Sequence, residues 1–428
     1  MQTLVISSNC SGGGKTTFTL GLMKALKDRG YKVQGFKCGP DYIDPAFHKA
    51  VTNNASRNLD TFLMTKEGMK EAFSRGEGDV AIIEGAMGLY DGKGVTTEGS
   101  CYEVCEILGD VPIVLVITPQ AQSLTLCAEI NGLKNFKNAN IAGVVLNSVS
   151  EKYYNLLKAC IEENCNVKVL GYVPKCDDIK LSSRHLGLVQ SVEVDNLLDK
   201  IEICKELIEK YVNVEEIINS LKNVSISSKR TKLKNRNIKI GIAYDKAFNF
   251  YYKENLEMLE EVGEVIYFSP LEHKEIPKDL DFLYIGGGYP EVFKEELSKN
   301  ISMRNSIKEA LENGLHCYAE CGGLMYLTEE IEGYPMVGFF QGKSFMTNKL
   351  NNFGYCKVKY EDLEITAHEF HKSLVELKEN KVNKVFKEDY RKETISWECG
   401  YKKKNTLAGY AHIHFIGNVE FLEYLLFT

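Results

Sequence analysis

The chain has 428 residues, of which 44% are hydrophobic and 26% charged, and its 59 acidic residues outnumber its 52 basic ones. This composition is typical of a globular protein and argues against disorder. The net charge of −7 argues against a nucleic-acid partner, because phosphate binding needs a basic surface. At roughly 150 residues per domain, the length predicts two or three domains.

Several absences in the sequence bear on location. No apolar run approaches the ~18 residues that span a bilayer, and the first ten residues, M-Q-T-L-V-I-S-S-N-C, lack the basic start of a signal peptide. The 13 cysteines are an odd and scattered set rather than a disulfide framework. We therefore expect a cytoplasmic protein with no membrane partner and no nucleic-acid partner.

Short apolar runs alternate with helical stretches in the first 195 residues. This alternation predicts a parallel sheet covered by helices. The strands are expected at residues 3–7, 32–37, 79–84, 111–117 and 141–146. Their nearly continuous Val and Ile content suits strands that are buried on both faces.

A polar segment divides the chain. Residues 195–223 have helical periodicity, and residues 225–237, S-I-S-S-K-R-T-K-L-K-N-R-N, are basic and nearly free of apolar side chains. We interpret this segment as a solvated interdomain linker, with a binding patch as the alternative. The predicted class is therefore α/β with two domains, residues 1–195 and 238–428, joined by a helical segment and linker at 196–237.

The α/β pattern starts again after the linker. Strands are expected at 238–244, 264–268, 281–285 and 315–319, with helices at about 253–262 and 303–313. The last ~95 residues are expected to carry shorter strands.

A glycine-rich loop, S-S-N-C-S-G-G-G-K-T-T at residues 7–17, lies between the first strand and the first helix. There the N–H groups of the loop and of the helix N-terminus form an anion site. The glycines let the backbone close around phosphates, the lysine reaches the terminal phosphates, and the first threonine offers a hydroxyl to Mg²⁺. The strict pattern has glycine where this chain has Asn9, so the motif is a variant, and a glycine turn without a ligand is the alternative. The predicted binding residues are Gly12, Gly13, Gly14, Lys15, Thr16 and Thr17.

Carboxylates follow two of the predicted strands. D-V-A-I-I-E ends in Glu84 and is followed by Asp91, while C-G-P-D-Y-I-D places Asp41 and Asp44 after another strand. The carboxyl ends of parallel strands face the ligand crevice. Because Mg²⁺ prefers a few carboxylates together with phosphate oxygens and water, we predict a metal site from Thr16, Asp41 and Glu84. The alternative is that each carboxylate is an ordinary surface residue.

A cysteine lies at a sharp turn in the second half. H-C-Y-A-E-C-G-G-L-M-Y-L predicts a strand, a turn at Cys321 and a helix, as in the nucleophile elbow of hydrolases. A thiol at a helix N-terminus has a lowered pKa, which makes the thiolate available. The base candidates are His412 and His414 in A-H-I-H-F, which would share one face of a strand.

An acyl-transfer site also needs donors for an oxyanion. G-G-G-Y-P-E follows a strand and offers the N–H groups of Gly287 and Gly288, and the N–H of Gly322 is the second donor. The alternatives are an inert buried cysteine, or a metal bound by Cys321 and the H-x-H pair. The pairs Cys101/Cys105 and Cys160/Cys165 and the H-x-x-H at 368–371 have no matching partners and are interpreted as structural.

Together the two halves resemble the cobyrinate a,c-diamide synthase family, whose members join a dethiobiotin-synthetase-like phosphate-loop ATPase domain to a class I-type glutamine amidotransferase domain. The resemblance covers essentially the whole chain. It is carried by seven segments in order: S-G-G-G-K-T-T, K-C-G-P-D-Y-I-D-P, E-G-A-M-G-L-Y-D-G, R-H-L-G-L, G-G-G-Y-P-E, Y-A-E-C-G-G-L-M-Y-L and H-I-H-F.

The resemblance implies a role for each matching residue. Cys321 would be the glutaminase nucleophile and His412 the residue that activates it, while His414 stands where the usual class I motif has Glu. In the synthetase half, the family's metal, phosphate and acceptor chemistry would fall to Asp41, Asp44, Glu84 and Asp91. Asn147 resembles the adenine-contacting position, and Arg184 and His185 would pair with substrate carboxylates.

The activity implied is ATP- and glutamine-dependent amidation of the a and c acetate carboxylates of cobyrinate, with Mg²⁺ as cofactor and a homodimer left open. The same chemistry fits nickel-sirohydrochlorin as acceptor, and cobyric acid synthase is a more distant match. A partitioning-type regulatory ATPase with an inactive second domain is the alternative from a different class, but Cys321, Gly322 and His412 argue against it. A biotin-pathway synthetase would have no use for the second half.

Overall fold

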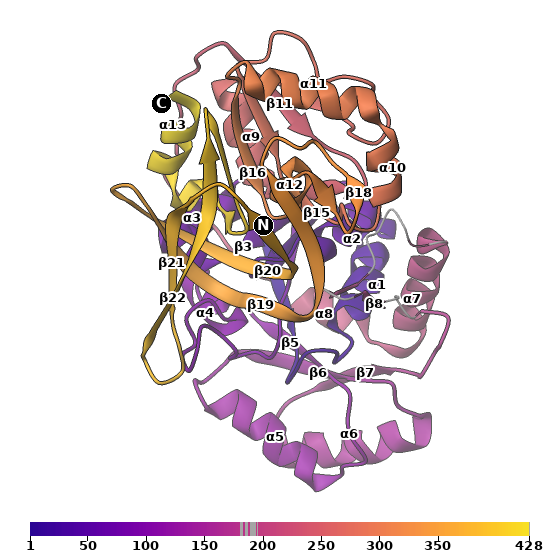
Figure 1. Cartoon of the computed structure of the whole chain (residues 1–428). Helices are drawn as coiled ribbons and strands as arrows, with labels where there is room; N and C mark the ends of the chain where they lie inside the picture. The colour runs from indigo at the N-terminus through magenta and orange to yellow at the C-terminus, as the bar shows by residue number, and fades with distance from the viewer. Residues whose placement is uncertain (180–182, 185–186, 189–193, 195, 428) are drawn as a thin grey trace. The chain divides into compact units, whose positions relative to one another are not determined.

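The computed structural model describes residues 1–179, 183–184, 187–188, 194 and 196–427 (Figure 1). The chain forms two compact units. The first comprises Met1–Thr61 and Thr65–Lys229, and the second comprises Arg230–Thr428 with the short segment Phe62–Met64. The division falls at Lys229/Arg230, and residues 224–237 contain no helix or strand.

The first unit is an α/β layer structure. Its strands are β1 (Gln2–Ser7), β2 (Val33–Cys38), β3 (Arg57–Leu59), β4 (Val80–Glu84), β5 (Ile113–Ile117), β6 (Ile141–Asn147), β7 (Val169–Val173), β8 (Ser183–Arg184), β9 (Gly187–Leu188) and β10 (Lys222–Asn223). Its helices are α1 (Lys15–Asp28), α2 (Ile43–Thr52), α3 (Thr61–Ser74), α4 (Cys101–Ile107), α5 (Leu124–Asn135), α6 (Glu151–Cys165), α7 (Leu197–Tyr211) and α8 (Val214–Ser220). The segment Phe62–Met64 that is grouped with the second unit lies in α3, and this helix is interrupted at Thr65.

The main sheet of this unit is parallel except at one short strand. Its order is β3-β2-β4-β1-β5-β6-β7, with β10 antiparallel to β1. The strands β4 and β5 are buried along their whole length, as expected for strands covered on both faces. Because β1 lies between β4 and β5, the loop after β1 opens at the edge where the strand order reverses.

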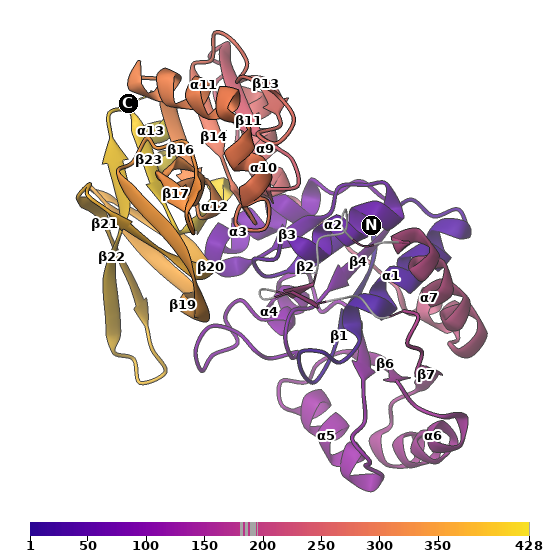
Figure 2. The ribbon, with the colours of Figure 1, turned by 45° about the vertical axis from the view of Figure 1, so that its right-hand side comes forward.

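The five strands predicted in the first half are confirmed, whereas β3 and β7 escaped detection. β3 has only three residues, and the five-residue strand β7 contains Gly171, whose φ of 143° favours glycine. Helix α7 packs on α1 at Gly21, where a Cβ would lie 2.6 Å from Ile208 Cδ1 (Figure 2). The absence of a side chain at Gly21 therefore permits this close approach.

The second unit contains a central parallel sheet that continues into an antiparallel one. Its strands are β11 (Ile238–Ala243), β12 (Phe248–Phe250), β13 (Gly263–Phe268), β14 (Phe282–Ile285), β15 (Gly287–Gly288), β16 (His316–Glu320), β17 (Glu330–Ile331), β18 (Tyr334–Pro335), β19 (Gly342–Tyr360), β20 (Leu363–Leu377), β21 (Lys381–Glu388), β22 (Thr394–Lys403), β23 (Thr406–Gly409) and β24 (His412–Ile413). Its helices are α9 (Lys253–Val262), α10 (Lys294–Lys299), α11 (Ile301–Glu312), α12 (Gly322–Leu327), the 3₁₀ turn η2 (Phe415–Gly417) and α13 (Val419–Phe427).

The expectation of short strands near the C-terminus is wrong. β19 has 19 residues and β20 has 15, and the two form an antiparallel ribbon with register shifts at Asn351 (Figures 1 and 2). Much of β19 is polar and exposed, so its length leaves no long hydrophobic run in the sequence. In the parallel part, β13-β11-β14-β16 match the predicted strands, and β23, which pairs parallel with β16, was not predicted.

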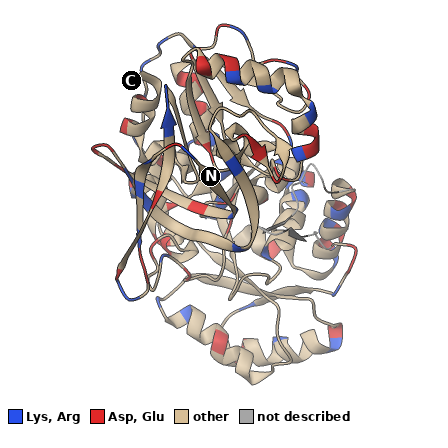
Figure 3. Cartoon of the chain, in the orientation of Figure 1, with Lys and Arg blue, Asp and Glu red and all other residues tan. Residues whose placement is uncertain are grey.

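Charges of both signs are interspersed over the described residues of both units in Figure 3, in keeping with the modest net charge. Within the first unit, Lys24, Asp28, Glu202 and Lys205 form ion pairs along α1 and α7. No helix among the described residues is long and apolar enough to cross a membrane.

Candidate active sites

The glycine-rich loop after β1 adopts the conformation that its residues permit. Gly12 and Gly14 have φ values of 75° and 91°, in the left-handed region where side chains are strained. Helix α1 begins immediately afterwards at Lys15. The Lys15 ammonium donates to the carbonyl oxygens of Cys10 at 2.8 Å and Met87 at 2.6 Å, which folds the lysine back over the loop. Burial, with Lys37 nearby, lowers the pKa of Lys15.

Two polar side chains, Asn147 at the end of β6 and Thr118 directly after β5, contact the backbone of this loop. A Cβ on Gly14 would lie 2.3 Å from Asn147 Nδ2, so the backbone of the loop touches the end of β6. Asn147 Nδ2 donates to Thr118 Oγ1 at 2.9 Å, and the Thr118 hydroxyl donates to the carbonyl oxygen of Gly13 at 3.2 Å. Asn147 therefore lies at the predicted phosphate loop.

The first threonine of the loop meets a buried carboxylate. Thr16 Oγ1 donates to Glu84 Oε1 at 2.6 Å, and Lys37 Nζ donates to the same oxygen at 3.0 Å. The contact between Lys37 and Glu84 follows from strand register, because Lys37 on β2 is the cross-strand neighbour of Glu84 on β4. His48 Nε2 lies 2.8 Å from the other oxygen, Oε2. Burial would raise the pKa of Glu84, but Lys37 and His48 hold that pKa below its usual range.

Asp44 and Asp41 have different surroundings in the structure. Asp44 Oδ2 lies 3.5 Å from Thr16 Oγ1 and forms an ion pair with Lys37. Asp41 Oδ1 instead accepts hydrogen bonds from the backbone N–H groups of Ile43 and Asp44, at 2.8 and 3.1 Å, at the start of α2. Of the two, the structure brings Asp44 to the threonine hydroxyl.

The oxygen donors near Thr16 are those a hard cation prefers. A hydroxyl and two carboxylates, from Thr16, Glu84 and Asp44, fit Mg²⁺ in kind. Among the described residues, no group of three or more His, Cys, Asp or Glu side chains could hold a metal by itself. These residues could therefore supply only part of a Mg²⁺ shell, with phosphate oxygens and water supplying the rest.

Asp91 lies in a second loop beside the first. Its Oδ2 accepts from the N–H of Gly88 at 2.8 Å, and the N–H of Leu89 donates to the carbonyl oxygen of Ser8 at 2.9 Å. The loop that follows β4 is therefore hydrogen-bonded to the phosphate loop.

The remaining predicted residues of the first half lie on other elements. Thr17 continues α1, and Arg184 lies on β8. His185 lies outside the described residues.

The second unit contains the predicted cysteine elbow. Cys321 stands between β16 and α12 with φ 49° and ψ −101°, a conformation that costs a non-glycine residue about 1–3 kcal/mol. Its N–H donates to the carbonyl oxygen of Gly409 at 2.7 Å, which fixes the turn to β23. The strand, turn and helix predicted here are confirmed.

Glycines line the surroundings of this elbow. A Cβ on Gly287 would lie 2.5 Å from His412 Cε1, and a Cβ on Gly322 would lie 3.1 Å from the backbone nitrogen of Gly288. The G-G-G-Y-P-E segment thus lies between the histidine and the start of α12. The three predicted oxyanion donors and His412 are therefore neighbours, although they come from three separate stretches of sequence.

The pKa of the thiol is shifted in the direction opposite to the one expected from a helix N-terminus. Burial, followed by the nearby carboxylate of Glu291, raises the pKa of the Cys321 thiol. Helix α12 has only six residues, and the N–H of Gly322 offsets a small part of the shift. Burial also lowers the pKa of His412 to about 3, with His371 adding to the shift. Burial therefore favours the neutral form of both the Cys321 thiol and the His412 imidazole.

The two histidines of H-I-H face different partners. His412 Nδ1 lies 3.6 Å from Glu320 Oε2, whereas His414 Nε2 lies 3.5 Å from Glu254 Oε2 and its ring packs on Tyr252 with centroids 4.7 Å apart. β24 ends at Ile413, so the alternation of a regular strand does not extend to His414.

Several buried groups of these sites escaped detection in the sequence. Lys37 and His48 hold Glu84, and Glu320 lies beside His412. The H-x-x-H segment on β20 also reaches this region, since His368 pairs in register with His412 and their ring centroids are 5.2 Å apart. Of these groups, only Glu320 could have been suspected from the sequence, because it directly precedes Cys321.

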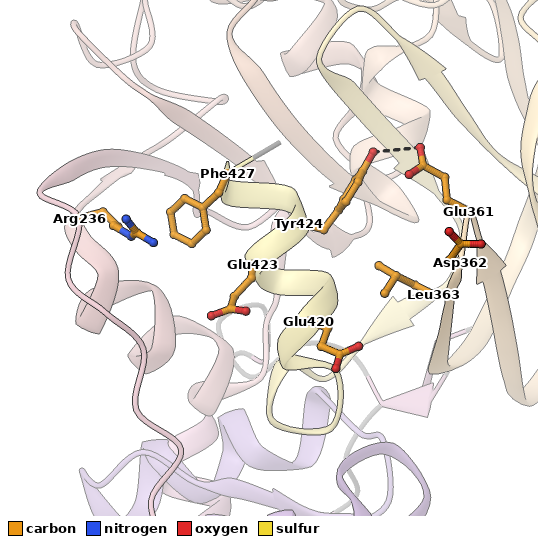
Figure 4. Close-up of a pocket in the computed structure, with 8 residues that line it drawn as sticks. All are labelled: Arg236, Glu361, Asp362, Leu363, Glu420, Glu423, Tyr424 and Phe427. Carbon is orange, nitrogen blue, oxygen red and sulfur yellow. Dashed lines mark hydrogen bonds between the residues drawn. The ribbon is translucent and has the colours of Figure 1, made fainter.

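A pocket of about 470 Å³ lies elsewhere in the second unit, beside α13 (Figure 4). Four carboxylates line it together with Arg236, which lies over the ring of Phe427. None of the predicted site residues borders this pocket.

Comparison with known proteins identifies the type of each half. Residues 239–419 match the family model of the CobB/CobQ-like glutamine amidotransferase domain, and residues 4–189 match that of the CobQ/CobB/MinD/ParA nucleotide binding domain. The chain is 57% identical to the cobyrinate a,c-diamide synthases of Clostridium tetani and Clostridium acetobutylicum, with 100% of each chain covered. It is 43% identical to that of Caldanaerobacter subterraneus subsp. tengcongensis, over 96% of this chain and 95% of the relative.

Proposed function

The chain belongs to the cobyrinate a,c-diamide synthase family, and we propose that it amidates the a and c acetate carboxylates of cobyrinate in cobalamin synthesis, with ATP as energy source and glutamine as nitrogen donor. The observation that carries this proposal is the presence, in one chain, of a nucleophile elbow at Cys321 and a phosphate loop whose Thr16 meets Glu84. Glutamine hydrolysis alone needs only the elbow, and ATP-dependent ligation alone needs only the phosphate loop. A glutamine-dependent ligase needs both features.

The glutaminase reaction falls to the second unit. Cys321 gives its thiol proton to His412 and attacks the side-chain amide carbon of glutamine. The N–H groups of Gly287, Gly288 and Gly322 are proposed to stabilise the tetrahedral oxyanion. Collapse of the intermediate breaks the C–N bond, and the proton on His412 leaves with ammonia. Water then hydrolyses the glutamyl thioester and restores the thiol.

The ligase reaction falls to the first unit. The N–H groups of Gly12, Gly13 and Gly14 and the Lys15 ammonium are proposed to bind the phosphates of ATP, with Thr17 at the start of the helix. An acetate carboxylate takes the γ-phosphoryl group to form an acyl phosphate and ADP. Ammonia then displaces phosphate and leaves the amide. Each of the two amidations consumes one ATP and one glutamine.

The remaining residues are proposed as ligands and substrate groups. Mg²⁺ would offset charge on the transferring phosphoryl group, held through Thr16 and Glu84, with Asp41 and Asp44 as further carboxylates. Asp91 also belongs to the acceptor and phosphate chemistry. Asn147 is proposed at the adenine, and Arg184 and His185 at the substrate carboxylates.

A cytoplasmic location and a homodimeric assembly are also proposed. All 13 cysteines are free thiols, which agrees with a reducing compartment. Size-exclusion chromatography with light scattering tests the assembly, since a 428-residue monomer and its dimer differ twofold in mass.

The decisive experiment uses the purified chain with ATP, Mg²⁺ and glutamine, and either cobyrinate or nickel-sirohydrochlorin, followed by mass spectrometry. Two successive conversions of acid to amide on cobyrinate are expected. Conversion of the nickel macrocycle alone would move the protein to the other acceptor. Hydrolysis of glutamine with neither macrocycle changed would show that both proposed acceptors are wrong.

A further inference from the structure

The group that orients His412 is not supplied by the H-x-H motif. A histidine that removes a proton from a nucleophile acts best when its second ring nitrogen is held by an acidic group, which fixes the tautomer. His414, two residues further on, is a base rather than an acid and lies against Glu254 and Tyr252. The orienting group must therefore come from elsewhere.

Glu320 has the geometry for this role. It is the last residue of β16, directly before Cys321, and its side chain is 2% exposed. Its Oε1 accepts a hydrogen bond from the N–H of Ile413 at 3.2 Å, which fixes the carboxyl group to the strand that carries His412. Its Oε2 accepts from Tyr284 Oη at 3.0 Å and lies 3.6 Å from His412 Nδ1.

We propose that Glu320 is the positioning residue for His412 in glutamine hydrolysis, and that this reaction requires Glu320 in its ionised form. The inference rests on the proposed function of the second unit. An ionised Glu320 accepts the Nδ1 proton of His412 and leaves Nε2 bare, so Nε2 takes the thiol proton of Cys321. The separation of 3.6 Å shortens when the imidazolium forms, since catalytic contacts often tighten only with substrate bound.

A protonated Glu320 has the opposite effect. It donates to Nδ1 and places the remaining ring proton on Nε2, where the histidine cannot act as a base. Burial raises the pKa of Glu320 to about 8, against hydrogen bonds from Ile413 N–H, Tyr284 and Tyr318 and the nearby His414. The titratable groups facing His412 are Glu320, His371 and Glu369, with the ring of His368 alongside. The activity should therefore rise as pH increases toward 8.

The test is the pH profile of kcat/KM for glutamine hydrolysis by the full chain, without ATP or macrocycle. Glu320→Gln is expected to lower kcat roughly 100-fold or more and to abolish the rise near pH 8, because an amide can stabilise the wrong tautomer. Glu254→Gln is the matched control, since it changes the buried carboxylate beside the other histidine. It should stay within about 3-fold of the wild-type rate with an unchanged profile.

A second variant keeps the test decisive if Glu320→Gln loses its fold, as judged by circular dichroism. Tyr284→Phe removes one hydrogen bond that favours the charged form of Glu320. The acidic limb of this variant's kcat/KM profile should therefore move to higher pH by roughly half a pH unit or more. The proposal is overturned if Glu320→Gln keeps the wild-type rate and profile, or if the limb of Tyr284→Phe stays in place. Absence of glutamine hydrolysis by the wild-type chain would instead overturn the proposed function itself.

Discussion

The two candidate sites each contain a buried glutamate, and the pKa values of these two glutamates are shifted in opposite directions. Beneath the phosphate loop, Glu84 is held ionised by Lys37 and His48, and Lys37 also pairs with Asp44. At the cysteine elbow, burial leaves Cys321 and His412 neutral and raises the pKa of Glu320. A site for a polyphosphate thus needs fixed charges before its ligand arrives. A site for a neutral amide can leave its nucleophile uncharged until substrate binds.

The largest effect is expected when the nucleophile is removed, which should abolish glutamine hydrolysis and leave the ligase site active. Cys321→Ala should lower glutamine hydrolysis roughly 10⁴-fold or more, because it removes the thiol that is proposed to form the thioester. Amidation with ammonium chloride as nitrogen source should remain within a factor of about three. Ammonia production and product masses measure the two rates. Equal glutamine hydrolysis by variant and wild type would contradict the assignment of Cys321.

The reciprocal variant changes the phosphate loop. Lys15→Met should lower ATP-dependent amidation about 10²–10³-fold with either nitrogen source, because it removes the cation that is proposed to bind the phosphates. Glutamine hydrolysis measured without ATP should be unaffected. Lys24→Met, on the exposed part of the same helix, is the control and should keep full activity. A normal amidation rate in Lys15→Met would refute the role of the lysine.

The charge network beneath the loop is expected to affect stability. Glu84→Gln removes one of the two carboxylates that pair with the buried Lys37 ammonium and the carboxylate that contacts His48, and it should cost about 3 kcal/mol of unfolding free energy in the first unit. The only tryptophan, Trp397, lies in the second unit, so urea unfolding followed by fluorescence there can be compared with circular dichroism of the whole chain. Only the circular-dichroism curve should shift to lower urea.

The exposed pair Lys32–Glu77 supplies the control, since Glu77→Gln should change stability by less than about 0.5 kcal/mol. Because the folded pKa of Glu84 lies below its unfolded value, its contribution is present above about pH 4.5 and is lost as pH falls below that value. A Glu84→Gln variant as stable as the wild type would show that this network adds nothing.

The close approach of the Gly287 backbone to His412 predicts a smaller effect on glutamine hydrolysis. Gly287→Ala places a methyl group where His412 Cε1 lies 2.5 Å away, so the imidazole must move. Glutamine hydrolysis should fall about 10–100-fold, since displacements of this size disturb proton transfer. Gly409→Ala, on β23, is the control, because its methyl group meets only Gly400 at 3.5 Å or more. Equal rates for the two variants would argue against the contact.

The smallest expected effect is a pH dependence of stability in the second unit. The folded pKa of Glu320 is about 8 and its ordinary value is 4.5, so the folded state binds this proton more tightly and loses stability as pH rises toward 8. His412 acts in the other direction but only below pH 6.5.

Between pH 6.5 and 8 the free energy of unfolding should therefore fall by about 1–2 kcal/mol. Urea unfolding followed by Trp397 fluorescence measures this change. Glu320→Gln should flatten the dependence, and Glu254→Gln should preserve it. The same slope in Glu320→Gln would mean that another group titrates.

The sequence alone determined the local features of this protein. The Val and Ile runs predict β1, β4, β5 and β6 because buried parallel strands need apolar residues on both faces. The glycines of the phosphate loop and the E-C-G-G turn at Cys321 are local signals for a loop and an elbow. These predictions depend only on neighbouring residues, which is why they can be made from a sequence.

The tertiary structure decided which distant groups meet and what they do to one another's charge. Strand register places Lys37 beside Glu84, and the pairing of β20 with β24 brings His368 to His412. Strands were expected near the C-terminus, but the lengths of β19 and β20 were not, because much of β19 is polar and exposed and carries no continuous hydrophobic pattern. The raised pKa of Cys321 likewise depends on burial, which no local motif encodes, since burial is a property of the whole packed unit.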